Sequence, residues 1–146
     1  MEVLPIEFRR LQSLEILWLD DNNFVTFPDC LSEISGLQSL RLQGNSIAVL
    51  PESVSGLQRL ETFDLSNNEI SKFPSVLSHL KSLKNLWLRQ NYLTEIDVEL
   101  LEWPCLEILS VSSNMLYQEN LSLVSEKLSK FRSLKSVYVN GQKTKK

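Results

Sequence analysis

Asparagine recurs at a constant interval through most of this sequence. It occupies Asn22, Asn45, Asn68, Asn91 and Asn114, so each copy follows the previous one by 23 residues. The same apolar pattern, L-x-x-L-x-L-x-x-N-x-L, surrounds every copy, with Phe, Ile or Val replacing some of the leucines. Five consecutive units of one length restrict the chain to a repeat architecture, in which each unit packs mainly on its neighbours.

The L-x-L step inside each unit predicts a short β-strand. Its two leucines fall on one face of the strand, and the residue between them falls on the other. The asparagine that follows can bond turn backbone groups through its side-chain amide, which predicts an asparagine ladder along the stack. We expect parallel strands near residues 15–19, 38–42, 61–65, 84–88, 107–111 and 135–139.

A second motif occupies the segment between successive strands. Proline fixes φ at about −65°, so this motif favours a narrow extended or 3₁₀ return path over a full α-helix. The proline is replaced once, at Ile96-Asp97. The intact motifs are Leu4-Pro5, Phe27-Pro28, Leu50-Pro51 and Phe73-Pro74.

The regular count changes near the C-terminus. Leu134 repeats the strand pattern but follows Leu106 by 28 residues rather than 23. Apolar residues between them recur at helical spacing, which predicts an amphipathic helix over 120–131. Asn120 begins a glycosylation sequon, and we expect it to cap this helix instead. The apolar residues are Leu121, Val124, Leu128 and Phe131.

These motifs resemble the leucine-rich repeat superfamily. The 23-residue unit with its Leu-Pro step is similar to the class found in cytoplasmic signalling scaffolds of the Scribble/Erbin and Ras-suppressor kind. The resemblance covers nearly the whole chain. It implies an α/β fold, a right-handed solenoid with a parallel sheet on the concave face, an irregular or 3₁₀ convex side and one C-terminal helix. We therefore expect a single domain over 1–146, closed by the unit 117–146.

The resemblance also implies that partners dock on the concave face, where the middle residue of each L-x-L lies. That row reads Trp18, Arg41, Asp64, Trp87, Ser110 and Tyr138. Beside it run Asp20, Gln43, Ser66, Arg89, Ser112 and Asn140 on one side, and Ile16, Ser39, Thr62, Asn85, Ile108 and Ser136 on the other. Trp, Tyr and Arg dominate binding hot spots. The residues expected to bind a protein partner are Trp18, Asp20, Arg41, Asp64, Trp87, Arg89 and Tyr138.

A structural alternative exists for the same row. Its aromatic residues can serve only to pack against neighbours on adjacent strands, and Arg41 can pair with Asp64 one strand away. Trp103 holds the repeat position of Leu57, so we expect it in the core. The lysines at the C-terminal end are expected to form a solvated tail without a function. They are Lys143, Lys145 and Lys146.

Composition narrows the class of partner. A formal net charge of −3 and a pI near 5.2 argue against nucleic acid, which selects clustered Lys and Arg. No apolar run long enough for a signal peptide or membrane span is found. Cys30 and Cys105 lie more than three units apart, so we expect two free thiols and a cytoplasmic protein, with the nucleus also open.

Catalysis is not expected. His79 is the single histidine, and no convincing triad or metal-ligand constellation can be assembled around it, so we expect no cofactor and no metal. The favoured function is a protein–protein interaction module, an adaptor or scaffold. The alternative is a structural subunit or homo-oligomer that associates through the N-terminal strand edge. Leu4-Pro5 belongs to a unit without a strand, which leaves strand 14–19 as an open edge of the sheet.

Overall fold

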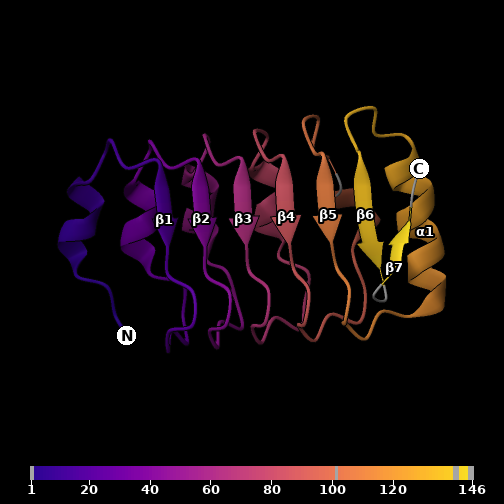
Figure 1. The fold of residues 1–146 in the computed structure, drawn as a ribbon, viewed down its shortest axis with the longest axis horizontal. Helices are drawn as coiled ribbons and strands as arrows, with labels where there is room; N and C mark the ends of the chain where they lie inside the picture. Colours follow the sequence, from indigo (N-terminus) through magenta and orange to yellow (C-terminus); the bar gives the residue numbers. More distant parts are fainter. Residues whose placement is uncertain (1, 101, 140–141, 145–146) are drawn as a thin grey trace.

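The sheet of this protein follows the order of the chain. The computed structural model describes residues 2–100, 102–139 and 142–144, and within them seven strands form one sheet (Figure 1). Six of them are parallel and lie inside the ranges expected from the sequence. They are β1 (Ile16–Trp18), β2 (Ser39–Arg41), β3 (Thr62–Asp64), β4 (Asn85–Trp87), β5 (Ile108–Ser110) and β6 (Ser136–Val139).

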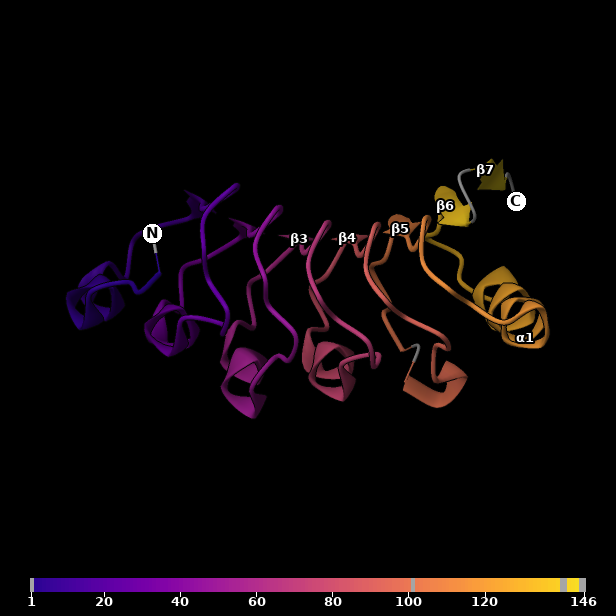
Figure 2. The ribbon, with the colours of Figure 1, turned by 90° about the horizontal axis from the view of Figure 1, so that it is seen from below.

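Short 3₁₀ helices return the chain from one strand to the next. Each of the first four begins directly after a proline, as the sequence predicted. The sheet lines the concave side of the solenoid and these helices lie on its convex side (Figure 2). They are η1 (Ile6–Arg10), η2 (Asp29–Glu33), η3 (Glu52–Gly56), η4 (Ser75–His79) and η5 (Val98–Leu100).

The core is a stack of equivalent apolar side chains. The register pairs the strand leucines of neighbouring units with one another, and Leu40, Phe63, Leu86 and Leu109 are completely buried. Leu17, on the first strand, is only partly buried. Because every unit buries its apolar face against the next, the alternation of residues fixes which side chains remain on the concave face.

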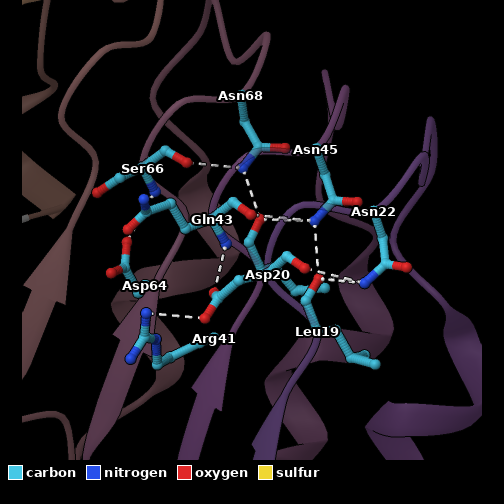
Figure 3. Close-up of polar contacts among 10 residues, drawn as sticks. Leu19, Asp20, Asn22, Arg41, Gln43, Asn45, Asp64, Ser66 and Asn68 are labelled. Atoms are coloured by element: carbon cyan, nitrogen blue, oxygen red, sulfur yellow. Dashed lines mark hydrogen bonds and ion pairs between the residues drawn. The ribbon is translucent and has the colours of Figure 1, made fainter. Parts of the chain in front are cut away.

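The asparagines form the expected ladder (Figure 3). The Asn68 amide donates to the carbonyl oxygens of Leu42 and Leu65 at 2.9 and 3.1 Å, and its Oδ1 accepts the Ile47 N–H at 2.9 Å. Asn45, Asn91 and Asn114 repeat these three bonds. The ladder ties the end of each strand to the units on both sides.

Helix α1 (Gln118–Ser129) begins two residues earlier than expected, and the prediction that Asn120 caps it is wrong. Tyr117 holds the N-cap position, without a side-chain cap bond. Asn120 lies in the first turn and its amide binds the preceding unit, accepting from the Ile96 N–H and donating to the Ile96 carbonyl, both at 2.8 Å. The side chain therefore joins the closing helix to the unit in which proline is replaced.

The C-terminal segment also differs from its prediction. Strand β7 (Gln142–Thr144) pairs antiparallel with β6, where a solvated tail was expected. The expected tail residues Lys145 and Lys146, and Asn140 of the concave rows, lie outside the described residues. The hairpin follows from backbone pairing with the last parallel strand, which side-chain composition does not reveal.

Two other predictions are confirmed. Cys30 is buried, Cys105 is exposed, and both are free thiols. Burial raises the pKa of the Cys30 thiol, which keeps it protonated. Trp103 is 1% exposed and donates its indole N–H to the Leu77 carbonyl at 2.7 Å. Within the described residues, no helix has the length and apolar character required to cross a bilayer.

Candidate functional site

The register of the sheet brings the predicted binding residues into one continuous row. Each member lies beside the next on an adjacent strand, at a spacing of about 4.8 Å. We call this row the central stripe: Trp18, Arg41, Asp64, Trp87, Ser110 and Tyr138. Its side chains project from the face opposite the leucine core. Asp20 and Arg89 follow two of these residues at the strand ends.

A charged and aromatic cluster forms the N-terminal end of the central stripe. The Arg41 guanidinium lies 5.1 Å from the centre of the Trp18 ring, in cation–π geometry. Arg41 Nη2 lies 2.8 Å from Asp20 Oδ2, and Asp20 Oδ1 accepts the Gln43 N–H at 3.2 Å (Figure 3). Trp18 nevertheless keeps 63% of its surface exposed. The strands thus hold a large aromatic side chain in place and leave it open to solvent.

The expected alternative pairing of Arg41 with Asp64 is wrong. Asp64 Oδ1 accepts the Ser66 N–H at 2.9 Å, which ties this carboxylate to its own turn (Figure 3). Asp20 stands two positions past the end of β1 and reaches the guanidinium from the opposite side. Strand register places Asp64 directly beside Arg41, yet the Asp64 carboxylate bonds its own turn and the ion pair forms with Asp20.

Aromatic residues flank a small residue at the other end of the central stripe. Trp87 and Tyr138 are half-buried, and Ser110 between them is only 4% exposed. The Ser110 hydroxyl lies 3.5 Å from that of Ser112. Ser66, Ser110 and Ser136 were expected on a solvent-facing surface, but all three are buried. The C-terminal end of the central stripe therefore presents aromatic side chains, while the serines there are buried.

Two polar atoms near the stripe are buried without a hydrogen-bond partner in the described part of the chain. They are Arg41 Nε and Ser66 Oγ. Such atoms are costly in a folded protein, and each requires an explanation. They show that the hydrogen bonds within the described concave face do not satisfy every buried polar atom there.

A second row of charges lies where the chain enters each strand, and sequence reasoning missed it. Lys84 Nζ lies 2.7 Å from Glu61 Oε2, and Lys135 Nζ lies 2.7 Å from Glu107 Oε2. The hydrogen bond that Lys84 donates to the Glu61 carboxylate raises the pKa of the Lys84 ammonium. These pairs are exposed enough to add little stability. The sequence signal for this second row was the alternation of Glu61, Lys84, Glu107 and Lys135 at the position before each strand.

The residues with catalytic potential are scattered. His79 lies exposed at the end of η4 on the convex side. Among the described residues, no group of three or more His, Cys, Asp and Glu side chains is arranged to hold a metal ion. The structure thus concentrates its unusual surface chemistry on the concave face.

Comparison with known proteins agrees with this arrangement. One family model, described as Leucine Rich Repeat, matches residues 13–34, and another, described as Leucine Rich repeats (2 copies), matches residues 35–79. A leucine-rich-repeat protein of Leptospira interrogans superposes with a TM-score of 0.84 at 31% identity, over 92% of this chain. The chain is a leucine-rich-repeat solenoid.

Other solved solenoids share the fold. An internalin C2 of Listeria monocytogenes matches 93% of this leucine-rich-repeat chain with a TM-score of 0.78 at 23% identity, which shows the fold alone. The complex of TLR13 with ssRNA13 matches 84% of it with a TM-score of 0.71 at 29% identity. A comparison with curated proteins gives no significant match. The chain spans 34% of the Leptospira protein, 56% of the internalin and 18% of TLR13.

Proposed function

We propose that this leucine-rich-repeat protein is a non-catalytic interaction module, an adaptor or scaffold, that binds a protein partner through its central stripe. The observation that carries the proposal is Trp18, which is 63% exposed on a sheet face while Arg41 holds its ring in place. Large aromatic and arginine side chains that are already ordered lose little entropy on binding, and such residues dominate hot spots.

The charges of the stripe favour a protein over a nucleic acid. Asp20 and Asp64 lie among Arg41 and Arg89, so the concave face carries both signs. Phosphate backbones bind surfaces that carry mainly positive charge, whereas protein interfaces combine apolar anchors with paired charges. The solved complex of TLR13 contains ssRNA13, whereas the described concave face of this chain mixes acidic and basic residues. The 23-residue Leu-Pro unit and two free thiols support a cytoplasmic scaffold of the signalling kind.

A second candidate function is assembly through the β1 edge. Leu19 and Asp21 donate their N–H groups to β2, which leaves the opposite edge of the strand at the end of the described sheet. Ile16 on this strand is 58% exposed. An unpaired edge with apolar side chains invites pairing with another chain.

Photo-crosslinking from chosen positions tests the proposed function. Benzoylphenylalanine is placed at Gln43 on the concave face, at Ile16 on the edge strand, or at His79 on the convex side. We expect the Gln43 position to give an adduct with a partner protein, because the side chain borders the central stripe. Mass spectrometry identifies the adducts.

The convex position is the matched control. Equal yields of the same adduct from His79 and Gln43 would contradict docking on the concave face. An adduct of two copies of the chain from Ile16, without a partner adduct from Gln43, would favour assembly through the β1 edge instead.

A further inference from the structure

Exposed apolar side chains gather on a second surface, the segment that follows the asparagine in the last units. Tyr92, Met115 and Tyr117 are 51%, 59% and 63% exposed. We call these three residues the flank patch. They lie beyond the ends of β4 and β5, outside the central stripe. Exposed apolar residues that cluster in this way mark interaction sites.

Backbone bonds between units place the flank patch residues side by side. The Tyr92 N–H donates to Ile70 O, and the Met115 N–H makes the same bond one unit later, to Leu93 O, both at 2.9 Å. The Tyr117 N–H donates to Thr94 O at 3.0 Å. Leu93 is fully buried while Tyr92 before it is exposed, so the patch side chains point away from the core.

The repeat does not require apolar residues at these positions. The place of Tyr92 and Met115 is held by Asn23, Ser46 and Glu69 in the earlier units, which form the same turn. A polar side chain therefore suffices for the fold. The apolar character of the last two units calls for another explanation, and contact with a partner supplies one.

Acidic residues lie close to the flank patch along the chain and at its equivalent repeat position in the preceding unit. Glu69, Glu95 and Glu119 are exposed, and none of them forms an ion pair with a described residue. Lys72 is the basic residue placed among them, at the repeat position of Glu95. The surface therefore combines an aromatic and methionine centre with a negative border. Its complement is a segment with apolar side chains flanked by Lys or Arg.

The backbone of the flank argues against strand pairing with the partner segment. Ile70 O, Leu93 O and Thr94 O are already bonded between units, so no free strand edge is available for an extended peptide. Recognition must therefore use side chains, as when an amphipathic helix lays its apolar face on methionine and aromatic residues. We propose that the flank patch binds a basic amphipathic helix of a partner protein, independently of the central stripe.

Methyl NMR offers a direct test, because the protein has two methionines, Met1 and Met115. The probe is a synthetic helical peptide of leucine and lysine, with leucines spaced to form one face. In protein labelled at the methionine methyls, we expect the Met115 signal to shift on titration and the Met1 signal to stay in place. We expect the affinity to fall as salt is raised, because the border charges are exposed.

Two matched variants complete the test. The double variant Tyr92→Ser, Met115→Ser copies the serine found at residue 46. We expect it to weaken the binding of the peptide by about tenfold, the scale of a hot-spot residue. Val25→Ser with Val49→Ser removes equally exposed apolar residues from the N-terminal part of the same flank and is expected to change nothing. A matched peptide with glutamate in place of lysine is expected not to bind.

Equal weakening by the two double variants would overturn the proposal. Equal binding of the glutamate peptide, or an unchanged Met115 signal at saturation, would overturn it as well. Trp87→Ala is expected to leave peptide binding intact. Loss of binding in that variant would place the peptide on the central stripe and would also contradict the flank patch, so the two surfaces are tested separately.

Discussion

Replacing Asn68 with alanine is expected to lower the free energy of unfolding by about 3 kcal/mol, at the upper end of the range for point substitutions. The buried Asn68 amide makes the hydrogen bond to the Ile47 N–H and bridges the carbonyls of Leu42 and Leu65. Alanine leaves the Ile47 donor buried without its partner. It also removes one step of the ladder between central units.

Asn22 is the matched control, because it lies at the first position of the same ladder and is only partly buried. Its amide donates to Leu19 O and Asp20 O within its own unit, at 3.1 and 3.0 Å. Asn22→Ala is expected to cost about 1 kcal/mol or less, the worth of an ordinary hydrogen bond. Urea unfolding followed by circular dichroism measures both variants, and equal losses would contradict the ladder as the link between units.

Trp103→Ala is expected to have the largest effect on stability, about 3–5 kcal/mol, because it removes a fully buried aromatic side chain. The indole packs edge-on against Phe73, with ring centres 6.2 Å apart, and bonds the Leu77 carbonyl. It fills the core beside η5, which is shorter than the other 3₁₀ helices. A smaller side chain leaves part of that volume empty.

Two companion variants separate the causes of the destabilisation expected for Trp103→Ala, namely the lost volume and the lost hydrogen bond. Trp103→Phe retains most of the volume but loses the bond to Leu77, so its expected cost is about 1–3 kcal/mol. Trp18→Ala removes the same residue type from an exposed position and is expected to cost about 1 kcal/mol or less, since little buried surface is lost. If Trp18→Ala destabilises the protein as much as Trp103→Ala, the assignment of one tryptophan to the surface and the other to the core is wrong.

The repeat made most of the fold predictable. A period of 23 residues places the pattern leucines, the ladder asparagines and the first five strands in register, because one unit determines its neighbours. The alignment of Trp18, Arg41 and Trp87 on one row followed from the same count and is confirmed. Their role in binding stays a prediction.

The errors lie where several neighbours compete for one group. Arg41 has a carboxylate on each side, and the bond from Ser66 N–H to Asp64 leaves Asp20 as its partner. The Asn120 amide could cap the helix or bond the preceding unit, and in the structure it bonds the N–H and carbonyl of the buried Ile96. Periodicity specifies which residues are close but does not specify which contacts form.

Trp87 gives the most direct test of the proposed function, because it stands in the middle of the central stripe beside Asp64 and Ser110. The decisive measurement is the affinity of the partner captured from Gln43, determined by calorimetry for the native protein and for Trp87→Ala. We predict a loss of affinity of about tenfold or more, with the circular dichroism spectrum and urea midpoint close to those of the native protein. Unchanged affinity in a folded Trp87→Ala variant would contradict the central stripe as the binding surface.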